Sequence, residues 1–168
     1  YPNDYDGIWA SCPAINWTQF LASGLWAVTV MNEYDHILGF HKINAFRDAV
    51  HNSVGGKENY FRVEERIDFD PYTILGQKTK GGKITEKDCL VKQEIWKGPH
   101  TTGNDFLWYG FLPGGTFWNK IIPIGSFYYP LIGKRPKCFS LVEQYVHLAF
   151  EDPKKDLLHL KIRDFEKV

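Results

Sequence analysis

Glu65 is the residue in this sequence whose surroundings best suit acid–base chemistry. It lies in an alternating stretch whose matching positions are apolar: Phe61, Val63, Ile67 and Phe69. A period of two places these side chains on one face of a β-strand, so we expect Glu65 to be buried among them. A buried carboxylate is costly unless it is paired or hydrogen-bonded, and burial raises its pKa toward the range of a general base. Glu65 is therefore expected to be a structural ion-pair partner, a ligand-orienting group or a catalytic base.

Two further polar side chains could act together with Glu65 as a base. Tyr145 and His147 share one face of the stretch Phe139–Phe150, where either could act as an acid or electrophile. Glu65, Tyr145 and His147 then predict an enzyme without a cofactor, such as an isomerase, cyclase or dehydratase. The sequence contains no G-x-S-x-G, H-E-x-x-H or phosphate-binding loop.

We expect no metal site. His36 and His41 are five residues apart, so in a strand they point to opposite faces and cannot hold one ion together. The cysteines show no C-x-x-C spacing either.

Aromatic residues gather in the segment Phe106–Tyr129, which is apolar on both faces. Aromatic rings with polar tips suit the wall of a cavity for a flat ligand. Gln93 is a second polar group on an apolar face, in a stretch with Cys89. The predicted ligand-binding residues are Glu65, Gln93, Trp108, Tyr109, Phe117, Trp118, Tyr128 and Tyr145. Alternatively, the aromatic segment packs a core or forms a protein-binding surface.

Composition limits the classes of protein to which the chain can belong. Its 168 residues suit a single domain, 1–168, with an irregular N-terminal arm over 1–23. Lys and Arg together number 20, as do Asp and Glu, so the chain lacks the charge of a nucleic-acid binder. No apolar run approaches the roughly 20 residues of a membrane-spanning helix. We expect a monomer or small homo-oligomer.

The dominant hydrophobic period along the chain is two, which indicates strands. We predict strands over Leu25–Met31, Tyr34–Lys42, Tyr60–Phe69, Tyr72–Lys80, Asp88–Trp96, Phe106–Leu112, Thr116–Ile124, Phe139–Phe150 and Leu157–Phe165. Gly81-Gly82 is the strongest hairpin signal. Only Asn44–Asn52 has helical character, with Asn44 as a candidate cap and Phe46 and Val50 on one side.

Sequential short strands with almost no helix between them exclude a doubly wound α/β fold. They predict an all-β, up-and-down antiparallel β-barrel of about eight to nine strands with one short helix. The alternatives are a β-sandwich and an α+β cone barrel. A barrel of this size can hold one small ligand.

The N-terminal region resembles the opening of lipocalins, through Cys12-Pro13 and then Gly24-Leu25-Trp26. The resemblance implies that Trp26 closes one end of a barrel and packs against an Arg near the last strand, for which Arg163 is the match. It also implies carriage of a small hydrophobic ligand. The second lipocalin motif and the late helix of that family are not recognisable here.

The cysteines and one sequon favour a secreted or luminal protein. We expect a disulfide between Cys12 and Cys138 and a buried, unreactive thiol at Cys89; three reduced thiols are the alternative. Asn16-Trp17-Thr18 is a possible glycosylation site. The predicted function is binding and carriage of a small hydrophobic or aromatic molecule in a barrel cavity, with no cofactor. The enzyme that uses Glu65 is the alternative.

Overall fold

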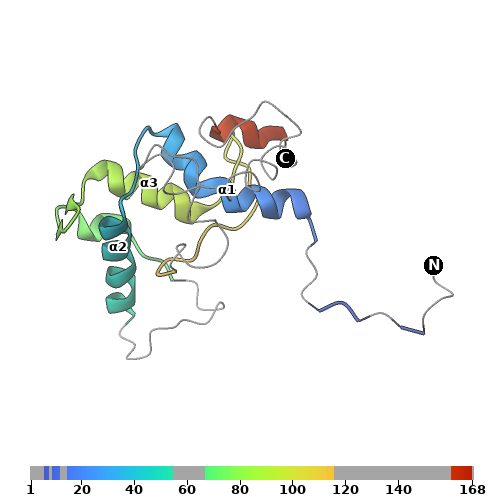
Figure 1. The fold of residues 1–168 in the computed structure, drawn as a ribbon, viewed down its shortest axis with the longest axis horizontal. Coiled ribbons are helices and arrows are strands. Elements are labelled where there is room, and N and C mark those ends of the chain that lie inside the picture. Colours follow the sequence, from blue (N-terminus) through green and yellow to red (C-terminus); the bar gives the residue numbers. More distant parts are fainter. Residues whose placement is uncertain (1–5, 8, 12–14, 55–66, 116–159, 168) are drawn as a thin grey trace, which may run out of the picture.

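The computed structural model describes residues 6–7, 9–11, 15–54, 67–115 and 160–167. This part of the chain is mainly helical (Figure 1). It contains α1 (Trp17–Glu33), α2 (Phe40–Ser53), α3 (Glu86–Lys97), the 3-10 helices η1 (Pro71–Ile74) and η3 (Ile162–Lys167), and strands β1 (Lys78–Thr79) and β2 (Gly82–Lys83). The predicted β-barrel is wrong, and its alternatives fail for the same reason, because the strands among these residues form one short hairpin.

Helix α1 occupies the region where the first strand, Leu25–Met31, was predicted. Every side chain from residue 25 to residue 31 is buried. A helix that is apolar on all sides gives the same unbroken hydrophobic run as a buried strand, so the period alone does not separate the two. The predicted arm over 1–23 overlaps the start of this helix at Trp17.

Helix α3 replaces the predicted strand Asp88–Trp96. A capping box begins the helix, because the Thr85 side chain accepts from the Asp88 backbone N–H while the Asp88 carboxylate accepts from that of Thr85. Asp88, Val91, Lys92 and Ile95 are buried at the spacing of one helix face. The signal was legible in the sequence, since Thr85-x-x-Asp88 precedes an apolar run.

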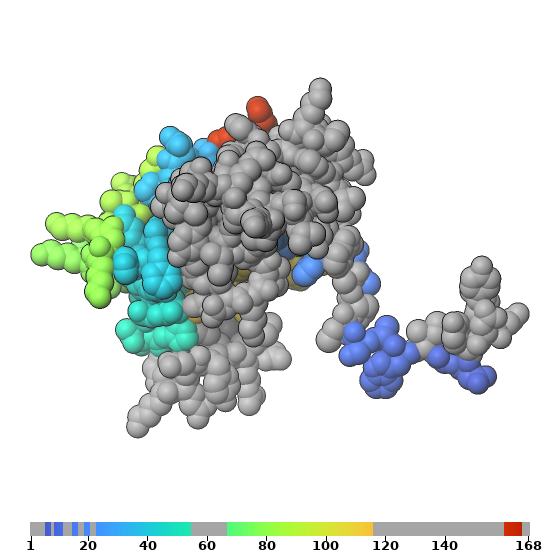
Figure 2. Space-filling model, viewed as in Figure 1, coloured from blue at the N-terminus to red at the C-terminus, as the bar shows by residue number. Residues whose placement is uncertain are grey.

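Two local predictions are confirmed. The helix predicted over Asn44–Asn52 lies within α2 and buries Phe46 and Val50, although it begins earlier, with Gly39 at the cap in place of Asn44. The hairpin signal is also correct, because β1 and β2 pair antiparallel, with Thr79 opposite Gly82. In the space-filling view the hairpin (green) projects at one end of the molecule, beside α2 (cyan) (Figure 2).

The core lies where α1 packs against α3 and η3. Trp26 is fully buried there, and its Nε1 donates to the Glu94 carbonyl oxygen at 2.9 Å. The Phe165 ring meets Trp26 edge-on with ring centroids 5.1 Å apart. The predicted partner Arg163 is exposed, so the lipocalin-type packing of Trp26 is wrong. Among the described residues, no helix is long and apolar enough to span a membrane.

Candidate binding cleft

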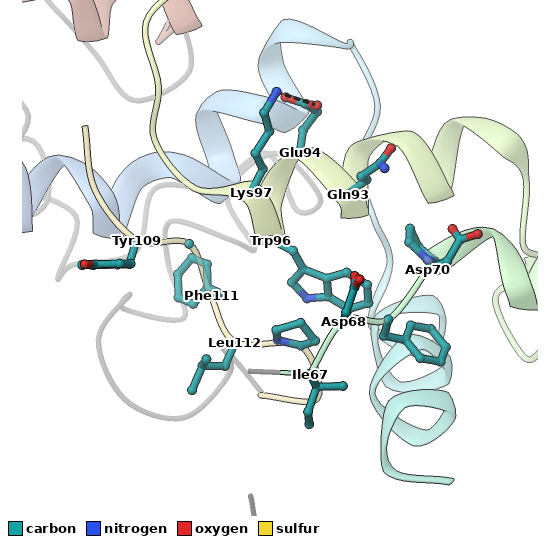
Figure 3. Close-up of a pocket in the computed structure, with 14 residues that line it drawn as sticks. Ile67, Asp68, Asp70, Gln93, Glu94, Trp96, Lys97, Tyr109, Phe111 and Leu112 are labelled. Carbon is teal, nitrogen blue, oxygen red and sulfur yellow. Dashed lines mark ion pairs between the residues drawn. The ribbon is translucent and has the colours of Figure 1, made fainter. Parts of the chain in front are cut away.

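An open cleft of about 830 Å³ lies against one face of α3. Its walls come from residues 67–71, from α3 residues 93–97 and from residues 109–113 (Figure 3). Trp96 stands at the centre, with Phe111 and Leu112 on one side and Asp68 and Asp70 on the other. Three segments distant in the sequence thus form one site.

The backbone crosses itself at Gly98 and Gly110, and this crossing brings the third wall, residues 109–113, against α3. Gly98 ends the helix with φ +90°, a backbone conformation that favours glycine. A Cβ on Gly110 would lie 2.2 Å from the Trp96 carbonyl oxygen, and one on Gly98 would lie 2.3 Å from the Gly110 nitrogen. The backbone segments around Gly98 and Gly110 are therefore so close that neither position has room for a side chain.

Trp96 supplies the flat aromatic surface of the cleft. Its ring meets those of Phe46 and Phe69 edge-on, at 6.2 and 6.1 Å between centroids. The Nζ of Lys92 lies 5.0 Å from the centroid of the Trp96 ring. The indole nitrogen is buried and, within the described part of the chain, has no hydrogen-bond partner.

Lys92 is a fully buried amine next to this aromatic surface. Burial disfavours its charged form and lowers the pKa of its ammonium from 10.5 to about 7. Lys92 faces the core and does not belong to the cleft lining. Lys92 therefore packs against Trp96 from the side of the core.

The rim of the cleft carries charge. Glu94 accepts from the His100 ring at 3.0 Å through Oε2, and its Oε1 lies 3.7 Å from the Lys97 ammonium. The other ring nitrogen of His100 lies 2.8 Å from the Thr101 carbonyl oxygen. Asp70 caps η1, since its carboxylate accepts from the Tyr72 backbone N–H at 2.9 Å. Asp68 is exposed.

A second polar cluster, centred on Asp88, lies outside the cleft lining. Burial by itself would raise the pKa of Asp88, but hydrogen bonds from Lys42, His36 and Thr85 outweigh burial and lower it to about 2. The neighbouring Cys89 is a buried free thiol that donates to the Pro71 carbonyl oxygen at 3.4 Å. Burial, and after it the negative charge of Asp88, raises the pKa of the Cys89 thiol to about 11. A thiol with so high a pKa is unreactive, as predicted.

Two predicted ligand-binding residues line the cleft. Gln93 lines it from an exposed position on α3, a helix where a strand was predicted. Tyr109 lines it from the wall formed by residues 109–113. Trp108 contacts Tyr109, with centroids 6.3 Å apart, without belonging to the lining. The other predicted site residues lie outside the described residues: Glu65, Phe117, Trp118, Tyr128, Tyr145 and His147. Cys12 and Cys138, between which a disulfide was predicted, lie outside them as well.

Trp96, Asp68 and Asp70 were missed as site residues. A helical spacing would have revealed Trp96, because Gln93, Trp96 and Lys97 are related by three and four residues and share one helix face. Nothing in the sequence pattern joins Asp68 and Asp70 to that face. Among the described residues, no group of three His, Cys, Asp or Glu side chains is arranged to hold a metal ion.

Comparison with known proteins finds a relative that is not a lipocalin. Over 139 residues the chain is 30% identical to a probable feruloyl esterase of Arthroderma benhamiae. The match covers 76% of this chain and 23% of the relative, so the chain spans about a quarter of that protein's length. No family model matches the chain. No solved structure matches it either.

This similarity, together with the helical fold, corrects two predictions. The lipocalin resemblance is wrong, because Gly24-Leu25-Trp26 lies inside helix α1 and does not begin a barrel strand. Carriage of a ligand inside a barrel is wrong for the same reason. What the chain resembles is one portion of a probable feruloyl esterase.

Proposed function

We propose that the chain is part of an esterase that cleaves esters of aromatic carboxylic acids, and that its cleft binds the aromatic acyl group. The observation that carries the proposal is an aromatic-walled cleft in a chain similar to a probable feruloyl esterase.

The size and lining of the cleft support binding of an aryl group. Its volume of about 830 Å³ suits a small organic molecule. Trp96, Tyr109 and Phe111 come from two walls and offer ring surfaces for stacked or edge-to-face contact. Packing of Trp96 against Phe46, Phe69 and Lys92 fixes its ring before a ligand arrives, which reduces the entropy lost on binding.

The chemistry of ester cleavage requires a nucleophile and a base in hydrogen-bond contact. The hydroxyls of Ser23 and Ser53 donate to backbone carbonyls in their own helices, at 2.7 Å each. The Cys89 thiol is buried and has a raised pKa. We therefore assign substrate binding, and no bond-breaking step, to the cleft.

Replacement of Tyr109 by alanine tests the proposal, because this side chain lines the cleft yet is 68% exposed and contributes little to the core. Methyl ferulate, titrated calorimetrically, should bind the wild-type chain and bind Tyr109→Ala about tenfold more weakly, the loss of one aromatic contact. Phe40→Ala is the matched control, since Phe40 is an exposed aromatic residue of α2 outside the cleft.

The control variant should keep the affinity of the wild type, and both variants should keep its circular dichroism spectrum and melting temperature. A folded wild-type chain that does not bind methyl ferulate at millimolar concentration would contradict the proposal. Equal weakening by Tyr109→Ala and Phe40→Ala would also contradict it, because the cleft would then have no special role.

A further inference from the structure

The cleft has an unbalanced charge. Among the described residues, the charged groups that line it are the carboxylates Asp68, Asp70 and Glu94 and the ammonium of Lys97, which is three negative groups and one positive group. Figure 3 shows Asp68 beside Trp96 and Asp70 farther away on the same side, whereas Glu94 and Lys97 lie together at the upper rim. Asp68 therefore places a negative charge beside the indole that an aryl ligand would contact.

Neither aspartate is in ion-pair contact with another residue that the structure describes. Lys97 is directed to Glu94, and the imidazole of His100 also contacts Glu94. Asp70 accepts from a backbone N–H, which leaves its formal charge in place. Within the described part of the chain, Asp68 and Asp70 form no ion pair.

Ester hydrolysis changes the charge of the acyl group that this cleft would hold. Water supplies a hydroxyl to the acyl carbon and a proton to the leaving alkoxide as the acyl C–O bond breaks. The resulting carboxylic acid loses its proton to solvent near neutral pH. A neutral ester thus becomes an anion inside a site that is lined with carboxylates.

We propose that the carboxylates of the cleft make it selective for neutral aromatic esters over the aromatic carboxylates that their hydrolysis produces. This inference rests on the proposed function and adds a role for Asp68 and Asp70, namely repulsion of the product. Asp68 and Asp70 are exposed to solvent, so dissolved salt screens this repulsion. Repulsion of this kind favours release of the product and keeps the cleft available for the next ester.

The test compares three ligands that share one aromatic group. Methyl ferulate and ferulamide are neutral, whereas ferulate is anionic at pH 7; the amide matches the carboxylate in size. At low salt the wild-type chain should bind ferulamide about tenfold more tightly than ferulate. At an ionic strength of about 0.5 M this ratio should fall several-fold, because salt screens charges and leaves shape unaltered.

Asp68→Asn is the informative variant, since Asp68 is an exposed side chain and the change preserves its shape. The amide-to-acid ratio should fall at least threefold, chiefly through tighter binding of ferulate. Asp48→Asn serves as the control, because Asp48 is an exposed carboxylate of α2 outside the cleft. It should leave the ratio unchanged.

The possible outcomes separate this inference from the proposed function. Failure of all three ligands to bind would overturn the proposed function. Binding of ferulate and ferulamide with equal affinity would overturn only the charge selection. A preference for the amide that responds neither to salt nor to Asp68→Asn would also overturn it, since the selection would then be steric.

Discussion

At the scale of single residues, Asp88 joins three parts of the chain through one buried carboxylate. Its oxygens accept from Lys42 Nζ of α2 at 2.6 Å, from His36 Nε2 of the α1–α2 connection at 2.8 Å, and from the Thr85 backbone and hydroxyl at 2.7 Å each. Charge-assisted hydrogen bonds of this kind are shorter and stronger than neutral ones. Asp88 therefore both begins α3 and holds α2 against it.

We expect Asp88→Asn to lower the free energy of unfolding at pH 7 by about 3 kcal/mol, because it leaves the half-buried Lys42 without its charge partner. Urea denaturation measures this change. Glu86→Gln, at an exposed position in the same turn, should change the value by less than about 0.5 kcal/mol. Similar losses in the two variants would contradict the role of Asp88.

Asp88 also makes a contribution to the free energy of unfolding that depends on pH. The folded pKa of about 2 lies below the unfolded value of 3.8, so the unfolded chain binds more protons between these two pH values. The stabilisation from Asp88 is complete above about pH 4 and is lost as the pH falls toward 2. Asp88→Asn should therefore differ most from the wild type above pH 4 and should approach it near pH 2.

At the scale of elements, the cleft depends on the crossing of Gly98 and Gly110 after α3. Gly110 is a strict constraint, because a Cβ there would meet backbone atoms of residues 96 and 98, which cannot rotate away. A single methyl group at this position must separate the third wall from α3. The cleft is thus formed by the absence of side chains at the crossing as much as by the aromatic groups around it.

Gly110→Ala should destabilise the chain by about 2 kcal/mol or more through overpacking, and it should abolish binding of methyl ferulate. Gly24→Ala is the matched control, since a Cβ there meets nothing within 4 Å and Gly24 lies inside helix α1. It should stabilise the chain by about 0.5–1 kcal/mol. Thermal unfolding measures both, and a Gly110→Ala variant as stable as the wild type would contradict the close crossing.

At the scale of the whole molecule, residues near the two ends of the chain share the core. Trp26 of α1 lies against Phe165 of η3, and the Asn32 carbonyl oxygen of α1 accepts from Lys161. The Glu33 carboxylate accepts from the Ile162 backbone N–H at 3.1 Å. The C-terminal residues therefore complete the packing of the first helix.

Phe165→Ala should reduce the free energy of unfolding by about 3–5 kcal/mol, because it leaves a cavity beside Trp26. Arg163→Ala tests the alternative that the arginine supports Trp26; since Arg163 is exposed, it should change stability by less than about 0.5 kcal/mol. Tryptophan emission followed during urea unfolding reports both. A larger loss in Arg163→Ala than in Phe165→Ala would contradict the observed core.

The fold was predictable only where local signals agree with tertiary packing. Helix α2 and the β1–β2 hairpin were found because amphipathic spacing and a glycine turn act over a few residues. Helix α1 was mistaken for a strand because its apolar run is unbroken, and α3 because Cys89, Val91 and Ile95, read in a short window, fit a period of two. The Thr85-x-x-Asp88 capping box was the local signal that could have corrected α3.

Of the site, Gln93 and Tyr109 could be named from the sequence as polar-tipped candidates, although their part in binding stays a prediction. Asp68 and Trp96 could not be joined, because they are 28 residues apart and come together only through the packing of α3. The sequence alone determined the α2 helix and the hairpin, since these depend on neighbouring residues. Cys89 is buried as expected, but on a helix and through packing against Pro71, not on the face of a strand. Only the tertiary structure decided that residues 67–71 and 109–113 enclose one face of α3, because that contact depends on a backbone crossing between Gly98 and Gly110 that leaves no periodic trace in the sequence.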